Sequence, residues 1–204
     1  PGSAPAPDPG YQIDNSCRFE AGDSASMTKN FSTPTIQDKW TVSFWVKRCK
    51  LGATQHIFGG VTDANNYGQI RFGSDDTLTW WQYDGDDYKQ GHRLPTQLFR
   101  DPAAWYHIVC VWDSGNATAG DRMKMYVNGT QVTTFTATVD PPQNTDGHFN
   151  SAVDHYIGTK GTGTPFPLSA YLAEFVFCDG QTYAASDFGE FDSRSPTIWK
   201  PKDV

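Results

Sequence analysis

The stretch of this sequence with the most binding chemistry reads WWQYDGDDYKQGH and spans residues 80–92. Adjacent residues on a strand point to opposite faces, so Trp80 and Trp81 cannot both enter one core. An exposed indole can stack on the apolar face of a sugar ring while nearby carboxylates accept hydrogen bonds from its hydroxyls. The alternative is that the sheet is covered on both sides or that the second ring packs under a loop. The candidate platform comprises Trp80, Trp81, Tyr83, Asp84, Asp86, Asp87, Tyr88 and His92.

Two polar loops also offer the hard oxygen ligands that calcium prefers. One contains Asp84, Asp86 and Asp87, and the other contains Asp63 and Asn65, followed by Asn66. Calcium needs about six to eight oxygen ligands, and neither loop has the spacing of an EF-hand. Acidic residues are also common in ordinary turns. Calcium at one of these loops is therefore one hypothesis, and turns without a metal are the other.

The motifs of several enzyme classes are missing. Glycoside hydrolysis generally uses two carboxylates that flank the scissile bond. The glutamates are Glu20, Glu174 and Glu190, and Glu190-Phe191-Asp192 lacks a second glutamate after it. The sequence has neither G-x-S-x-G nor H-E-x-x-H, and we expect His107 to be a structural strand histidine rather than a general base. We therefore predict a protein that is not an enzyme.

The composition of the chain argues against some classes of binding partner. The chain has 204 residues with 16 basic and 23 acidic side chains, a net charge of −7. This argues against nucleic acid as a partner, because binding to phosphates depends on Lys and Arg. No window approaches the roughly 18 apolar residues of a membrane-spanning helix. Cys17, Cys49, Cys110 and Cys178 are far apart and form no C-x-x-C pair, so we favour free thiols over disulfides or zinc.

Short runs of β-branched and aromatic residues, separated by Gly, Asp, Asn and Pro, predict an all-β fold with two antiparallel sheets. The clearest strand spans residues 40–49, with Val42, Phe44 and Val46 on its buried face and Trp45 interrupting its polar face. Residues 105–113 are apolar on both alternating sets, which predicts a central strand covered on both faces. Further strands are expected at residues 69–72, 78–83, 123–127, 130–135, 155–158 and 171–178.

Turns and domain boundaries complete the outline. Asn128-Gly129 can supply the two positive-φ residues of a type I′ hairpin. Residues 113–121 and 139–154 are loops by composition, and residues 184–188 fit a helical turn with Ser186 or an earlier residue as its cap. Residues 1–10 are expected to form a proline-rich arm or the remnant of a tag, and residues 11–204 a single domain.

Several of these segments resemble laminin G-like, concanavalin A-like jelly rolls. The string AWYHIVCVWDSGNATAGDRMKMYVNG resembles the central hairpin of that family, and TVSFWVKR, HYIGTK and YLAEFVFCDGQ look like its other strands in the expected order. The tail SDFGEFD followed by WKPK is similar to a subgroup found in bacteriophage structural proteins and marine viral metagenomic sequences.

The resemblance implies a two-sheet antiparallel sandwich that commonly binds carbohydrate, sometimes beside calcium. It favours a non-catalytic, lectin-like module at a virion surface or another extracellular location, with a host surface glycan as its partner. The alternative is a purely structural virion domain that contacts other virion proteins or further copies of itself in a homo-oligomer. A polysaccharide-degrading enzyme ranks third. Alginate-lyase-like members would need clustered Arg, Gln, His and Tyr on the concave sheet, with a Q-x-H triplet, and we expect neither here.

Overall fold

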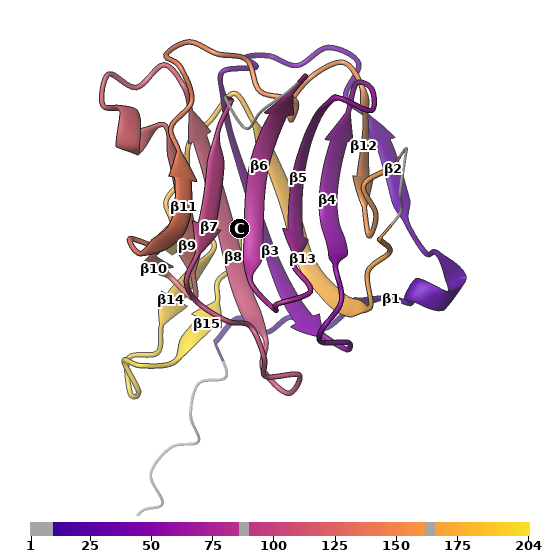
Figure 1. The fold of residues 1–204 in the computed structure, drawn as a ribbon. Coiled ribbons are helices and arrows are strands. Elements are labelled where there is room, and N and C mark those ends of the chain that lie inside the picture. Colours follow the sequence, from indigo (N-terminus) through magenta and orange to yellow (C-terminus); the bar gives the residue numbers. More distant parts are fainter. Residues whose placement is uncertain (1–9, 86–89, 162–165) are drawn as a thin grey trace, which may run out of the picture.

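Two antiparallel β-sheets pack face to face as a sandwich in the computed structural model, which describes residues 10–85, 90–161 and 166–204 (Figure 1). We refer to them as sheet A, with six strands, and sheet B, with seven. A short two-stranded sheet near the C-terminus accompanies them. Among the described residues, no helix is long and apolar enough to cross a membrane. The predicted all-β sandwich is confirmed.

Each sheet mixes strands that are distant in sequence. Sheet A has the spatial order β1 (Cys17–Phe19), β13 (Ala170–Asp179), β3 (Lys39–Arg48), β8 (Tyr106–Asp113), β9 (Met123–Val127) and β10 (Thr130–Gln131). Sheet B has the order β11 (Phe135–Val139), β7 (His92–Pro95), β6 (Leu78–Asp84), β5 (Asn66–Phe72), β4 (Gln55–Val61), β12 (Asp154–Ile157) and β2 (Met27–Asn30). The small sheet pairs β14 (Gly189–Phe191) with β15 (Trp199–Pro201), and the 3-10 turns are η1 (Ala21–Asp23), η2 (Ala119–Asp121) and η3 (Ala185–Asp187).

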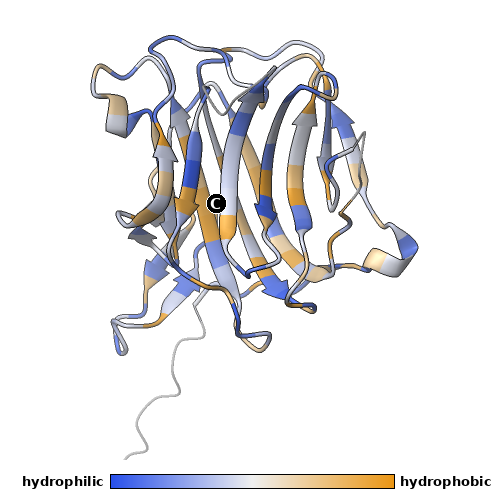
Figure 2. Ribbon diagram, in the orientation of Figure 1, coloured by the Kyte–Doolittle hydropathy of each residue, from blue (hydrophilic) through white to orange (hydrophobic). Residues whose placement is uncertain are grey.

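The core lies between the facing surfaces of sheets A and B and is rich in aromatic rings. Trp40 stacks on Trp112 with ring centroids 6.1 Å apart, and Trp80 meets Trp40 edge-on at 5.5 Å. All three indoles are fully buried. Hydropathy changes from residue to residue along many strands, as alternation between a core face and an outer face requires (Figure 2).

The predicted central strand is confirmed, because every residue of β8 from Tyr106 to Trp112 is buried. Its inner side belongs to the main core, whereas Val109 and Val111 pack against Ala185 and Phe188 of the C-terminal region. The outer side of β3 is also buried, although its residues are polar. The Thr41 hydroxyl donates to the Gln181 carbonyl oxygen at 3.0 Å, so the C-terminal segment covers a face that the alternation predicts to be open.

The predicted turns are present, but one predicted strand is shorter than expected. Asn128 and Gly129 both have positive φ, 47° and 77°, which confirms the hairpin. The strand predicted at residues 130–135 is wrong in its extent, because β10 ends at Gln131 and the chain then moves to sheet B as β11. The helical turn is η3, and its N-cap is Ala184, which confirms the alternative of a residue earlier than Ser186; the Ala184 N–H donates to the Asp187 carboxylate at 2.8 Å.

Candidate functional site

The outer surface of sheet B carries the side chains that can do binding chemistry. In the register of β5 and β6, Gln69 lies opposite Trp81, and Arg71 lies opposite Thr79 and, on the other side, His56 of β4. Their neighbours Ile70, Phe72 and Trp80 belong to the core, so alternation turns this set outward. We call the outward set of His56, Tyr67, Gln69, Arg71, Trp81 and Tyr83 the β4–β6 face.

The two adjacent tryptophans point to opposite faces, as predicted. Trp80 has no exposed surface and contacts Trp40 and Trp112, so its assignment to the sugar platform is wrong. Trp81 lies on the β4–β6 face, yet its side chain is only 6% exposed. The Arg71 guanidinium carbon lies 4.2 Å from the centre of the Trp81 ring, which explains part of this burial. The sequence therefore located the strand, and the register shows which indole faces outward.

Aromatic rings and cations form the upper layer of the β4–β6 face. Tyr67 and Tyr83, opposite each other on β5 and β6, stack with centroids 5.1 Å apart. Lys160, in the segment after β12, places its Nζ 3.5 Å from the centre of the Tyr67 ring. Each cation thus lies against an aromatic ring, whose negative face attracts it.

Two buried polar atoms form the lower layer. His56 and Gln69 are each 2% exposed, and their buried His56 Nδ1 and Gln69 Oε1 atoms form no hydrogen bond of ordinary geometry with the described residues, although the two side chains lie close enough to interact with each other. Burial lowers the pKa of His56 to about 3, and the charges of Arg71 and Lys160 lower it further, while Gln69 opposes the shift. The imidazole is therefore neutral near pH 7, and both atoms can take part in hydrogen bonds to a ligand.

The remaining residues of the predicted platform lie at its rim. His92 on β7 meets the Trp81 ring edge-on at 5.7 Å, and burial lowers its pKa, as do Arg93 and Arg71. Asp84 ends β6 and accepts a hydrogen bond from Gln90 Nε2 at 3.0 Å. Asp86, Asp87 and Tyr88 lie outside the described residues.

The second loop proposed for calcium is organised as a turn. Asp63 accepts hydrogen bonds from the Asn65 N–H at 2.8 Å and from the Asn66 side chain. These bonds lower the pKa of Asp63, first through Asn66 and then through Asn65. In the part of the chain that the structure describes, no three His, Cys, Asp or Glu side chains gather as a metal site would require. Asp63 and Asn65 thus fit the turn interpretation.

Sequence reasoning missed five residues of this surface: His56, Tyr67, Gln69, Arg71 and Lys160. The alternation of Tyr67, Gln69 and Arg71 within one strand was a usable signal, because these residues share one face. The expectation that no Arg, Gln, His and Tyr set would form is also wrong. The β4–β6 face assembles one from different strands, and the sequence does contain a Q-x-H triplet, Gln90-Gly91-His92.

A second aromatic site lies on the outer side of sheet A. Trp45, Trp105 and Trp199 line a pocket of about 300 Å³ together with residues of the segment 13–16. His107 lies beside it, and its Nδ1 accepts a hydrogen bond from Trp199 Nε1 at 3.0 Å. A neutral imidazole must then carry its proton on Nε2, which donates to Ser43 Oγ at 2.8 Å. His107 therefore cannot act as a base toward Ser43.

Comparisons with known proteins agree with the architecture. A sequence model of the concanavalin A-like lectin/glucanases superfamily matches residues 20–181. A comparison with curated protein sequences gave no match. Among solved structures, a heptameric SAP-like pentraxin from Limulus polyphemus is 18% identical, with a TM-score of 0.50 over 83% of this chain and 72% of that one.

Two larger proteins contain a similar fold. The LG4-5 domains of the mouse laminin α1 chain are 15% identical, with a TM-score of 0.54 over 87% of this chain and 45% of that one. The K499G mutant of the NanB sialidase from Streptococcus pneumoniae is 14% identical, with a TM-score of 0.55 over 87% of this chain and 28% of that one. At such identities the likeness concerns the fold alone. The match of the family model over most of the sequence, together with the two-sheet sandwich, shows that this chain belongs to the concanavalin A-like lectin/glucanase superfamily.

Proposed function

We propose that this chain is a non-catalytic carbohydrate-binding domain and that the β4–β6 face holds the glycan. The observation that carries the proposal is the layered arrangement on this face. Arg71 stacks on Trp81 beside the Tyr67–Tyr83 pair, and the buried polar side chains of His56 and Gln69, which form no well-aligned hydrogen bond through Nδ1 and Oε1, belong to the same face. Aromatic faces suit the apolar side of a pyranose, and fixed polar groups suit its hydroxyls. Membership of a lectin/glucanase superfamily supports the same conclusion.

The test is a glycan array probed with the purified domain, with bacterial surface and algal polysaccharides included. Trp81→Ala removes the central ring of the β4–β6 face. Trp45→Ala is the matched control, because Trp45 is also 6% exposed but lies on sheet A. We expect Trp81→Ala to abolish or strongly reduce glycan binding while the melting temperature falls less, and Trp45→Ala to leave binding intact. Binding that survives in Trp81→Ala and disappears in Trp45→Ala would assign the sugar to the tryptophan pocket of sheet A instead.

A parallel array with calcium and with chelator addresses the metal. The contacts described on the β4–β6 face involve rings, a guanidinium, an ammonium and neutral polar groups; they include no carboxylate, and the Gln69 Oε1 atom alone falls far short of the six to eight oxygens that calcium needs. We therefore expect binding to be insensitive to chelator. Binding that chelator abolishes would move the site to the Asp loops.

The biological setting we propose is a bacteriophage particle, with the domain at the virion surface and a host glycan as its partner. This part of the proposal is supported by the resemblance of SDFGEFD and WKPK to phage structural proteins. Mass spectrometry of purified virions from a phage that encodes the chain would test it. Absence of the chain from the particles would refute the virion role and leave the proposal of glycan binding unchanged.

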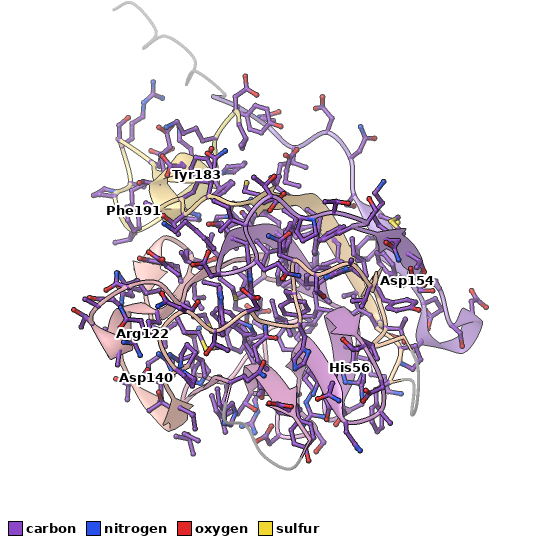
Figure 3. The ribbon with its side chains drawn as sticks, turned by 90° about the horizontal axis from the view of Figure 1, so that it is seen from above. His56, Arg122, Asp140, Asp154, Tyr183 and Phe191 are labelled. Atoms are coloured by element: carbon purple, nitrogen blue, oxygen red, sulfur yellow. The ribbon has the colours of Figure 1, made fainter. Side chains whose placement is uncertain are left out.

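A structural role in assembly is favoured by one specific observation, an apolar patch near the C-terminus. Tyr183, Phe191 and Ile198 are 36%, 46% and 55% exposed, and Phe191 and Ile198 belong to the segment that forms β14 and β15. In the view from above, Tyr183 and Phe191 lie on the far side of the sandwich from His56 (Figure 3). Exposed apolar groups often mark contacts between proteins. Self-association that Phe191→Ser and Ile198→Ser abolish would support this role.

Catalysis is the third candidate, and the Arg, Gln, His and Tyr set on the β4–β6 face is what favours it. A β-elimination would need a residue that neutralises the acid group, a base and a proton donor, for which Arg71, His56 and Tyr67 are the available groups. The burial of His56 beneath the upper layer argues against direct access to a substrate. An increase in absorbance from unsaturated uronate products, lost in His56→Ala, would establish catalysis.

A further inference from the structure

Resting on the proposed function, we propose that the β4–β6 face selects acidic glycans, whose carboxylate or sulfate groups pair with Arg71 and Lys160. The first argument is local charge. The protein as a whole carries 23 acidic and 16 basic side chains. On the β4–β6 face this balance is reversed, because none of its outward residues is Asp or Glu and Arg71 lies at its centre.

The second argument is the environment of Lys160. Seven other cations, Arg18, Lys39, Arg48, Arg93, Arg100, Lys124 and Lys200, each lie within ion-pair distance of a carboxylate. Lys160 is half-buried, and within the described part of the chain its close partner is the Tyr67 ring and not a carboxylate. An ammonium held against an aromatic ring keeps its charge available for an anionic ligand.

The third argument is the positive potential that neighbouring groups experience. Burial lowers the pKa of Lys160, and the charge of Arg71 lowers it further. Arg71 acts in the same direction on His56 and on His92, which face it from β4 and β7. The positive charge of Arg71 therefore lowers the pKa values of three basic groups that lie on different elements.

The neutral lower layer specifies a sugar rather than a simple anion. The Gln69 Oε1 atom is an acceptor without a well-aligned hydrogen bond, so a ligand hydroxyl can donate to it. A sugar acid or a sulfated sugar offers hydroxyl donors and an anionic group in one molecule. It can thus interact with Gln69 and the cations together, whereas sulfate or chloride, which have no hydrogen-bond donor, cannot.

The experiment uses a glycan array that contains neutral, uronate-containing, ulosonate-containing and sulfated glycans. Arg71→Gln/Lys160→Gln is compared with Lys47→Gln/Arg194→Gln, a control on other surfaces that changes the net charge by the same amount. Each acidic glycan that binds is then tested in its carboxyl-reduced or desulfated form, which separates the two sources of charge. We expect binding to acidic glycans only, weakened about tenfold or more in the first variant and in high salt, and unchanged in the control.

The outcomes separate this inference from the proposed function. Neutral glycans bound as strongly as acidic ones, with no effect of Arg71→Gln/Lys160→Gln, would overturn acid selectivity and leave glycan binding standing. Equal weakening in the control variant would assign the effect to bulk charge and would also overturn it. An array with no bound glycan would refute both proposals. If the double variant does not fold, Lys160→Gln alone still decides, because Lys160 lies in a loop segment and not in the core.

Discussion

The turn that joins β5 to β6, the two strands that carry Arg71 and Trp81, is anchored by a buried ion pair. Arg48 Nη1 of β3 lies 3.0 Å from Asp76 Oδ1, and the Arg48 side chain is only 1% exposed. The Gly52 N–H also donates to Asp76 at 2.8 Å, and the Arg48 guanidinium lies over the Phe72 ring at 4.3 Å. We predict that Asp76→Asn substantially destabilises the fold.

The size of the effect follows from the burial of both partners. Removing one member of a buried ion pair costs about 3 to 5 kcal/mol, because the other charge is left without compensation. Asparagine keeps an oxygen that can accept from Gly52, so we take the lower figure, about 3 kcal/mol. For a chain of this length, a loss of that size corresponds to a melting temperature lower by about 6 to 12 °C.

The pH dependence of the same variant provides a second check. Burial raises the pKa of Asp76, but the hydrogen bond from Gly52 and the ion pair with Arg48 outweigh it, so the pKa lies below its usual value. A depressed carboxyl pKa adds stability above the pKa of the unfolded chain, and this stability is lost as the pH falls through the folded pKa. The gap between wild type and Asp76→Asn should therefore be constant from pH 7 to about 5 and close below about 4.

Urea denaturation followed by tryptophan fluorescence measures these differences. Asp113→Asn is the matched control, since its pair with Lys39 is longer, 3.7 Å, and both side chains are more exposed. It should cost less than about 1 kcal/mol. If Asp76→Asn were as stable as Asp113→Asn, or if its deficit did not begin to narrow as the pH falls below about 4, the role assigned to the buried pair would be wrong.

Two further predictions concern the histidines. His155 is buried, and burial lowers its pKa to about 4, so the unfolded chain takes up this proton near pH 6.5 and the folded chain only much later. The free energy of unfolding should therefore fall by about 2 kcal/mol between pH 7 and 4.5 on account of His155. In urea titrations, His155→Phe should reduce this dependence of stability on pH. An unchanged pH dependence would contradict the low pKa assigned to His155. Because His107 accepts a hydrogen bond from Trp199 through Nδ1, its Nε2 carries the proton and cannot activate Ser43. Ser43 should therefore not react with diisopropyl fluorophosphate, as intact-mass spectrometry can check. A labelled Ser43 would refute the tautomer assigned to His107.

The sandwich was predictable because its central strands alternate strongly. Val42, Phe44 and Val46 mark β3, and the two apolar sets of residues 105–113 mark β8 as covered on both faces. Strands such as β4, with two glycines in QHIFGGV, carry no such alternation and were missed. Gly59 and Gly60 are needed for packing rather than for strand propensity, since a Cβ at Gly59 would lie 2.8 Å from the Lys160 carbonyl oxygen.

Only part of the β4–β6 face could be predicted from the sequence, because the register of a strand depends on the strand with which it pairs and not on its own residues alone. The sequence marked Trp80 and Trp81 as a pair on opposite faces but could not tell which one enters the core. His56, Gln69 and Arg71 come from two strands, and only their hydrogen-bonded register brings them beside Trp81. The cover over β3 and β8 comes from Gln181, 140 residues beyond its partner Thr41, and from Trp199, 92 residues beyond its partner His107, and local alternation cannot indicate such contacts.

Strand geometry also explains how an acidic protein can offer a cationic face. Asp84 ends β6, Asp154 begins β12 and Asp63 lies in a turn, so these carboxylates sit at strand ends, whereas Arg71 lies opposite Thr79 within the sheet. Asp84 is three residues along the strand from Trp81, over which the Arg71 guanidinium lies, and this spacing is about 10 Å at roughly 3.3 Å per residue. That is slightly more than the Debye length at physiological salt, so the carboxylate at that end of the strand is partly screened from the centre of the β4–β6 face. An anionic ligand that reaches this face therefore lies nearer to Arg71 and Lys160 than to these carboxylates, so the local positive charge acts on it more strongly than they do.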